Sequence, residues 1–286
     1  MTIDVKNRDI AILSGRQRAR LAGTFAKLKK RMPFALPYDL SWLSLFLIVV
    51  AVTLAYLSFG ATGFGSSIIA VPVLAHVLPL TFVVPLITAT DGGAVTLSTI
   101  RQWRQVDWPE FRRIFIPASI GIALGSTLLV NLPRNIALIA LGAFVILFAL
   151  YTLSGARQWQ AIDTKWAIPA GLFGGVFSAL FGTGGPIYMS YLSSRIDDKT
   201  ALRATSAMCV ASAVVLRAVL FAFTPLWFQP GMWTLIMLLL PCMVIGYTIG
   251  NHLHLRLSVA TLRGGIAWLL LANGVLLILR ATGAMS

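Results

Sequence analysis

Apolar segments of bilayer-spanning length restrict the fold of this chain more than any other feature. Eight of them approach the ~20 residues that a spanning helix needs, at about 41–59, 81–100, 114–131, 135–154, 166–181, 205–224, 233–250 and 264–280. With 58% hydrophobic and only 11% charged residues, the chain has too little polar surface to cover a soluble globule. The sequence therefore predicts an all-α polytopic protein of the cell membrane, which is the inner membrane in a Gram-negative source.

The net charge of +14 is concentrated at the N-terminus. Residues 1–38 hold nine basic side chains and two acidic ones, so 9 − 2 gives +7, half of the total. A basic segment of this kind can bind nucleic acid, but here an uncharged apolar run from Ser41 to Phe59 follows closely. The positive-inside rule is the better explanation. We expect a cytoplasmic N-terminus in contact with anionic lipid, and no nucleic-acid partner.

Two shorter apolar pieces, at about 64–78 and 185–194, each follow a glycine cluster and contain a proline. Pieces this short indicate broken or half-length helices. Matching Gly63 with Gly182 needs an offset of 119 residues, and the same offset pairs Trp108 with Trp227. Farther along, an offset of 125 pairs two glycines with two others, Gly121 and Gly125 with Gly246 and Gly250. These matches predict an internal duplication.

The predicted organisation has four parts. They are a basic cytoplasmic extension (1–38), a first transmembrane repeat (39–154), a linker (155–165) and a second transmembrane repeat (166–286). If each short piece crosses the membrane, every repeat has five spans and the repeats are inverted. If each piece re-enters on one side, every repeat has four spans, the repeats are parallel, and the arginine-rich connection at 101–113 is cytoplasmic. Both topologies remain open at this stage.

The two glycine loops are the first candidate for an anion site. Irregular backbone is tolerated in hydrocarbon only where it lines a cavity or is buried in protein. Each loop opens a short helix, whose N-terminus presents free N–H groups and partial positive charge to an anion. The alternative is that the glycines only allow close helix packing. The predicted substrate-binding residues of the two loops are Gly63, Gly65, Ser66, Ser67, Gly182, Thr183, Gly184 and Gly185.

Charged residues inside the apolar segments are the second candidate. Arg217 lies in the middle of an apolar segment, where it costs at least ~2.5–3.5 kcal/mol on insertion scales. We expect it to bind the substrate anion, with a purely structural arginine as the alternative. Asp91, in the middle of 81–100, is expected to couple proton movement to transport or to neutralise Arg217. Arg203 begins a helix and is expected at the mouth of the cavity, unless it belongs to a solvated loop.

Other kinds of chemistry find little support. His252 and His254 are two residues apart, on different faces of a helix, and no cysteine or carboxylate cluster completes a metal site. The chain has no P-loop motif for ATP-driven transport. No catalytic residues, no metal and no cofactor are predicted.

At the two loops the sequence resembles the sulfite exporter TauE/SafE family, also called the toluene-sulfonate uptake permease (TSUP) family. The run Gly63–Pro72 is similar to that family's G-x-G-G-G-x-x-x-V-P motif, with Ser66 and Ser67 in place of two glycines. The run Gly182–Pro186 is similar to its second-half G-x-G-G-P pattern. The resemblance covers about 41–281. It implies a multi-pass carrier of sulfite, sulfoacetate or related sulfonates, often working outward.

The resulting hypothesis is a secondary transporter of small organic or sulfur-containing anions, an exporter that works by alternating access between two repeats. Its partners are the anionic substrate and the lipid bilayer; the oligomeric state is not predicted. The alternatives are a non-transporting membrane scaffold or subunit that recruits partners through the basic N-terminus, and a membrane-embedded enzyme.

Overall fold

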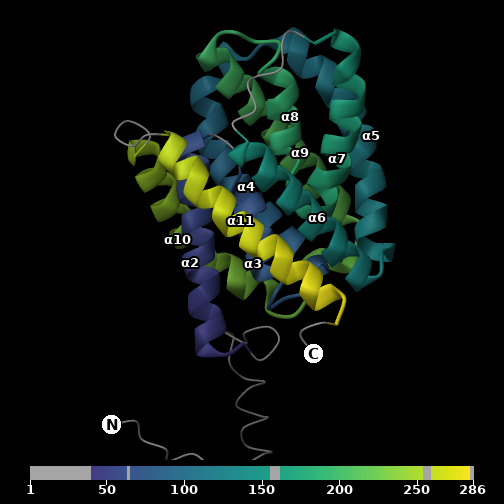
Figure 1. Cartoon of the computed structure of the whole chain (residues 1–286), viewed down its shortest axis with the longest axis vertical. Helices are drawn as coiled ribbons and strands as arrows, with labels where there is room; N and C mark the ends of the chain where they lie inside the picture. Colours follow the sequence, from purple (N-terminus) through teal and green to yellow (C-terminus); the bar gives the residue numbers. More distant parts are fainter. Residues whose placement is uncertain (1–39, 63–64, 155–161, 254–258, 284–286) are drawn as a thin grey trace, which may run out of the picture.

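The computed structural model describes residues 40–62, 65–154, 162–253 and 259–283, and within these ranges it contains helices and no strands (Figure 1). The predicted all-α fold is confirmed. The predicted extension 1–38, and Gly63 in the first loop, lie outside the described residues.

Each predicted apolar segment corresponds to one helix. The first half contains α2 (Trp42–Thr62), α3 (Ser66–Leu74), α4 (Leu80–Gln102), η2 (Trp103–Gln105), α5 (Trp108–Asn131) and α6 (Arg134–Leu153). The second half contains η3 (Thr164–Trp166), α7 (Ala167–Phe181), α8 (Gly185–Leu192), α9 (Lys199–Ala222), η4 (Pro225–Phe228), α10 (Met232–Leu253) and α11 (Val259–Ala281).

Helices α5 and α9 begin nearly two turns before their predicted apolar segments, and an aspartate caps each of them. The carboxylate of Asp107 accepts a hydrogen bond from the Glu110 N–H (3.1 Å) at the start of α5. Asp198 does the same with the Ala201 N–H (2.7 Å) at the start of α9. Such side chains satisfy N–H groups that have no partner inside the helix. Hydropathy alone misses these polar first turns.

The sequence predicted a full-length span at 166–181, and the structure corrects this prediction. At 15 residues, α7 is about 22 Å long, less than the ~30 Å hydrocarbon core. It ends at Gly182, whose positive φ of 73° reverses the chain. A Cβ on Gly174 would meet the Tyr188 ring, and one on Gly184 would meet the Ser178 side chain. Helix α8 therefore packs back along α7, and the two form a hairpin.

Five helices within the described part of the chain are long and apolar enough to cross a membrane. They are α2, α5, α6, α9 and α10, in the ranges Trp42–Ala61, Trp108–Asn131, Arg134–Leu153, Lys199–Ala222 and Met232–His252. Helices α4 and α11 contain shorter described apolar stretches, Leu80–Thr96 and Ala267–Ala281. The membrane nature of the protein is thus supported by length and composition.

Glycines bring α5 and α7 into backbone contact. A Cβ on Gly121 would collide with the carbonyl oxygen of Leu172, and one on Gly125 would lie 2.6 Å from the carbonyl oxygen of Val176. A backbone carbonyl cannot move aside as a side chain can. Small residues at these positions are therefore required for the close approach that stabilises helix pairs in lipid.

The same arrangement recurs between α10 and α2. A Cβ on Gly246 would collide with the carbonyl oxygen of Thr53, and one on Gly250 with that of Leu57. Thr53 and Leu57 match the α7 contact residues at the 119-residue offset, and the glycines match at the 125-residue offset. The first helix of each half therefore packs against the glycine-containing helix of the other half: α2 against α10, and α7 against α5. These reciprocal contacts support the proposed duplication.

The matching helices α4 and α9 run antiparallel at the centre. The N–H of Asp107, after the end of α4, donates to Thr205 Oγ1 (2.9 Å) near the start of α9. At the opposite end, Gln229 Nε2, after α9, donates to the carbonyl of Thr81 (2.8 Å) near the start of α4. Of the two topologies left open by the sequence, this is the relation that an inverted duplication predicts.

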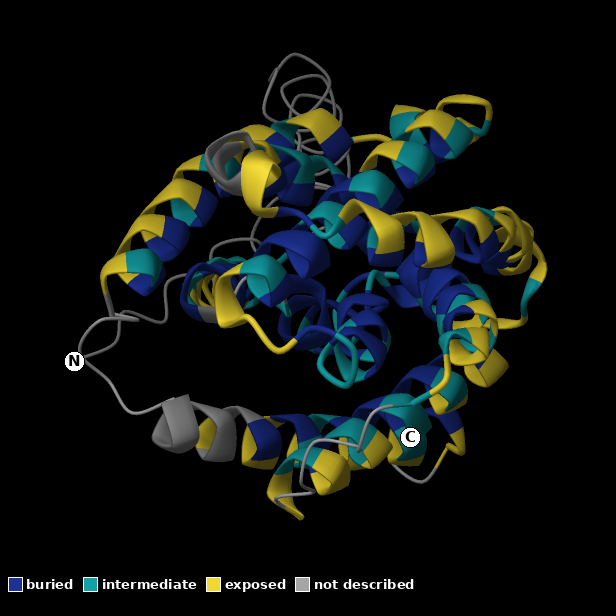
Figure 2. Cartoon of the chain, turned by 90° about the horizontal axis from the view of Figure 1, so that it is seen from above, coloured by how far each residue is buried: buried dark blue, intermediate teal, exposed yellow. Residues whose placement is uncertain are grey.

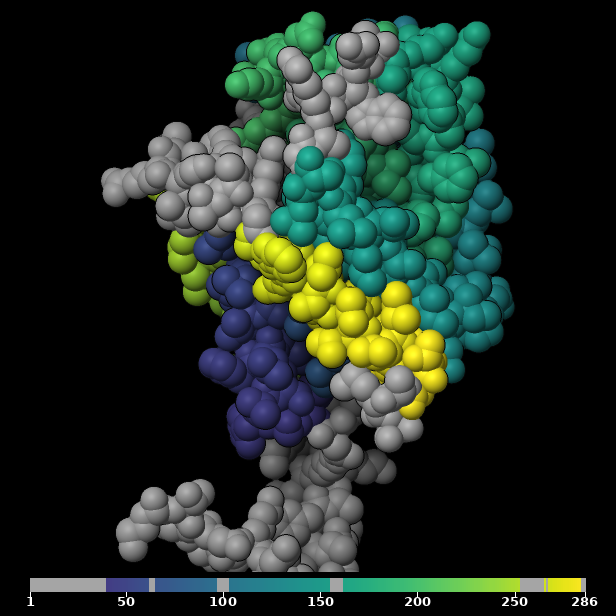
Figure 3. Space-filling view, in the orientation of Figure 1, coloured from purple at the N-terminus to yellow at the C-terminus, as the bar shows by residue number. Residues whose placement is uncertain are grey.

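The outer helices enclose a buried centre. Seen from above, the inner helices are almost wholly buried, and the outer ones turn exposed faces outward (Figure 2). Helix α11 crosses the face seen in Figure 3 as an oblique band and packs against α6 and α3. Large exposed hydrophobic side chains lie on α2, α5, α6, α10 and α11, far beyond what a soluble surface carries. Lipid is the solvent that this surface fits.

Basic residues precede α2 in the sequence, and others lie around the starts of α5 and α9 at the far end of the helical body. Helix α2 runs parallel to α10, so it begins at the end where α4 also begins. The basic segment 1–38 joins the helices there, whereas Arg104, Arg113 and Arg195 lie at the opposite end. The positive-inside rule cannot be satisfied for both groups at once. The sequence argument that the N-terminal charge alone orients the protein therefore loses its force.

Candidate functional site

The two glycine loops face each other at the centre of the molecule. Gly65 before α3 has a positive φ of 99°, and Gly182 after α7 one of 73°. A Cβ on Gly182 would lie 2.7 Å from the Ser67 side chain. The loops line one cavity, whose walls are Gly65, Ser66, Ser67, Ile68, Gly182, Thr183, Gly185, Pro186 and Val210.

Six of the predicted loop residues therefore gather around one space. Gly184 does not line it, because that residue packs against the backbone of Gly174 on α7. The space is small: at about 10 Å³ it has room for about one water molecule. A solute larger than water fits this space only if the two loops move apart.

Both half-helices point their first turns at the cavity. Neither α3 nor α8 has a side-chain hydrogen bond capping its N-terminus. Their first N–H groups therefore keep the partial positive charge that favours an anion. Thr183 Oγ1 lines the same cavity, is buried, and has no hydrogen-bond partner among the described residues. A buried hydroxyl beside a cavity can donate to, or accept from, a group that occupies that cavity.

The carboxylate of Asp91 accepts hydrogen bonds from the two serine hydroxyls that follow the first loop. It lies at the middle of α4, 2% exposed, and accepts hydrogen bonds from Ser66 Oγ (2.8 Å) and Ser67 Oγ (2.9 Å). The hydroxyl of Tyr56 on α2 lies 2.9 Å from the same carboxylate. Ser66 and Ser67, which stand where the family motif has glycine, thus donate their hydroxyl hydrogen bonds to the Asp91 carboxylate.

Arg217 on α9 is the counter-charge of Asp91. Its NH2 lies 3.7 Å from Asp91 Oδ2, and its NH1 donates to the carbonyl of Ser178 (2.6 Å). The side chain is 1% exposed, and its Nε has no hydrogen-bond partner among the described residues. Arg217 does not line the cavity; its NH1 lies behind Gly182, 3.1 Å from where a Cβ would be. Of the two expectations for Asp91, the structure shows neutralisation of Arg217 directly.

Arg203 joins α9 to the end of α2, and its expected position at the mouth of the cavity stays a prediction. Its NH2 donates to the carbonyl of Gly60 (3.3 Å) in the last turn of α2, and it is absent from the cavity wall. This contact connects the first turns of α9 with the last turn of α2.

Sequence reasoning missed several polar contributors. Tyr56 and Ser178 touch the charged pair but lie inside apolar segments with no motif around them. The sequence alone could have identified them only if their contacts with Asp91 and Arg217 were already known. Within the described residues, no group of three or more His, Cys, Asp or Glu side chains is placed to hold a metal ion.

Comparisons with known proteins find relatives of this chain. A model of the family described as Sulfite exporter TauE/SafE matches residues 47–277. The chain is also similar to the probable inner membrane transporter protein TsaS of Comamonas testosteroni. The two share 27% identity over 192 residues, which are 66% of this chain and 80% of that protein. No solved structure matches the chain.

Proposed function

This chain belongs to the sulfite exporter TauE/SafE family and is a membrane transporter, not an enzyme; from that premise we propose that it carries small organic or sulfur-containing anions. Sulfite, sulfoacetate and related sulfonates are the proposed substrate class. The observation that carries this proposal is the convergence of two uncapped half-helix N-termini on one cavity beside a buried arginine.

Alternating access fits the size of that cavity. Room for one water molecule means that the described state is closed around the site. The loops belong to two separate hairpins, α2–α3 and α7–α8, so moving one hairpin opens the site from one side. The two inverted repeats, as proposed, exchange these roles in the outward and inward states.

Asp91 is the proposed coupling residue. Its carboxylate holds hydroxyl donors of the first loop and the guanidinium of Arg217, the same groups that a substrate anion requires. Protonation removes the negative charge and frees donors for the substrate. Binding of a proton and of an anion therefore reinforce each other, and the linkage is reciprocal.

Export is the proposed direction, because an anion that leaves a negative-inside cell moves down the electrical gradient. The cytoplasmic N-terminus in contact with anionic lipid stays part of the proposal. Thiol labelling of a cysteine placed at Asp39, compared with one at Arg104, reads the orientation directly. Labelling of position 39 from the outside contradicts it.

The test of the function is anion flux through purified protein in liposomes. Sulfite, sulfoacetate and chloride are compared, with Ser66→Ala/Ser67→Ala as the site variant. Ser119→Ala is the matched control, since that hydroxyl bonds only its own helix on an exposed face. We expect saturable sulfonate or sulfite flux that the site variant alters and the control leaves unchanged. Flux that is absent for every anion contradicts the proposal.

A further inference from the structure

We propose that Glu110 and Arg195 form a gate latch that closes the substrate site at the end of the molecule where α9 begins, and that Arg280 and His76 form its counterpart at the opposite end. The inference rests on the proposed alternating access. It adds which contacts must break for each side to open.

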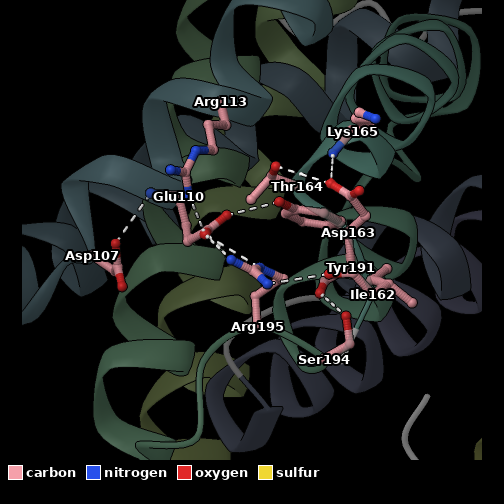
Figure 4. A network of polar contacts seen from close by, with 10 residues as sticks. All are labelled: Asp107, Glu110, Arg113, Ile162, Asp163, Thr164, Lys165, Tyr191, Ser194 and Arg195. Atoms are coloured by element: carbon pink, nitrogen blue, oxygen red, sulfur yellow. Dashed lines mark hydrogen bonds and ion pairs between the residues drawn. The ribbon is translucent and has the colours of Figure 1, made fainter. Parts of the chain in front are cut away.

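Glu110 is the centre of the first latch (Figure 4). It lies in the first turn of α5 and is 5% exposed. Its Oε1 accepts from Arg195 Nε and NH2, both at 3.3 Å, and forms an ion pair with Arg113. Its Oε2 accepts from the hydroxyl of Tyr191 (2.8 Å). A buried carboxylate with charged and neutral donors is costly to leave partly unsatisfied, so the cluster holds together.

These contacts fasten the second hairpin at its outer end. Tyr191 lies in the last turn of α8, and Arg195 in the connection that follows it. Arg195 NH1 also donates to the carbonyl of Ile162 (3.2 Å), which precedes α7. Both ends of the α7–α8 hairpin are thus tied to one another and to α5. Because α8 begins at the cavity wall with Gly185, release of the latch lets that wall move.

The first hairpin is held at the opposite end by a different contact. His76 follows α3, and Arg280 in the last turn of α11 donates to the His76 carbonyl. The offset of 119 residues that matches the two loops also matches His76 with Arg195. Since α4 begins after His76 and α9 begins after Arg195, the antiparallel course of these helices puts the two contacts at opposite ends.

The two latches differ in strength. The first joins a buried carboxylate to a pair of arginines and a tyrosine, and the second joins an exposed arginine to one backbone carbonyl. Charge-assisted bonds to a buried group contribute more than a single neutral acceptor does. The described conformation is therefore closed more firmly at the Glu110 end, and removal of that carboxylate charge shifts the population toward opening there.

Thiol accessibility of the cavity tests this inference. The reporter is Thr183→Cys in a chain that carries Cys209→Ser and Cys242→Ser, labelled with a membrane-impermeant maleimide from either side of sealed vesicles. Glu110→Gln is expected to raise the labelling rate about tenfold from the Glu110 side only, the size of one lost charge-assisted bond. Arg280→Gln is expected to raise labelling from the other side only.

Matched variants separate a latch from a merely structural cluster. Arg112→Gln removes a neighbouring arginine of α5 that lies outside the cluster, and leaves labelling unchanged. Tyr191→Phe deletes one hydrogen bond and is expected to raise the labelling rate less than Glu110→Gln does, on the same side. It keeps the test available if Glu110→Gln does not fold. Equal changes from both sides, or a lower unfolding temperature with unchanged labelling, overturn the inference. Labelling needs no substrate, so an absence of anion flux refutes the proposed function separately.

Discussion

Replacing Arg217 with methionine tests the electrostatic core of the site. The variant keeps most of the side-chain volume but removes the only counter-charge within 4.0 Å of the Asp91 carboxylate among the described residues. Both side chains are almost fully buried, at 2% and 3% exposure, so solvent cannot take over the missing charge. Removing one partner of a buried ion pair costs about 3–5 kcal/mol.

The double variant Asp91→Asn/Arg217→Met gives the matched comparison. Asparagine keeps one acceptor oxygen for a serine hydroxyl and places an NH2 donor at the other position, where the second serine hydroxyl can turn to accept. No buried charge remains at the site. We expect each single variant to lose about 3–5 kcal/mol and the double variant to lose much less than their sum. The difference measures the coupling between the two charges.

The assay is the free energy of unfolding of the purified protein in detergent, followed by tryptophan fluorescence with denaturant. Sulfonate flux in liposomes is measured on the same preparations. If the two single effects add within about 0.5 kcal/mol, the charges do not interact. The argument that Asp91 and Arg217 neutralise one another is then refuted.

Three further substitutions, two of them with a matched control, have defined outcomes. Gly125→Ala places a methyl 2.6 Å from a backbone carbonyl and is expected to cost about 1–3 kcal/mol in unfolding, whereas Gly92→Ala, with nothing within 4 Å, is expected to be neutral or slightly stabilising. Gly182→Ala forces a side chain into a positive φ against the site and is expected to abolish flux. Gly283→Ala has the same kind of φ in open space, so its flux should match the parent protein. Tyr56→Phe removes a donor from Asp91 and is expected to lower unfolding free energy by about 1–3 kcal/mol, a value that chemical denaturation reads directly.

Hydropathy predicted the helices because the bilayer imposes a local length requirement on each one. Helices α2 to α11 correspond to the predicted segments, but α5, α9 and α11 begin earlier than predicted because polar residues in their first turns lower the local hydropathy. The length of α7 was misjudged for a related reason. Hydropathy predicts a short span for an apolar run of sixteen residues, because it cannot show that α7 forms a hairpin with α8.

The candidate site was predictable in its residue types and not in its partners. Glycine loops and intramembrane charges are visible in a sequence because each violates a rule of the hydrocarbon environment. That Asp91 takes the hydroxyls of Ser66 and Ser67 is invisible there, since these residues are about 25 positions apart and meet only when α3 packs on α4. The Glu110–Arg195 contact spans 85 positions and had no motif to mark it.

The sequence by itself determined that this is a helical membrane protein with two interrupted segments and two costly buried charges, because those properties follow from local composition and the solvent. Only the tertiary structure decided that α4 and α9 run antiparallel, that the two loops meet at one cavity, and that Asp91 and Arg217 pair beside it. Those outcomes depend on which helix faces pack together. Packing is set by glycine contacts between distant segments such as α5 with α7 and α10 with α2, and no local pattern encodes it.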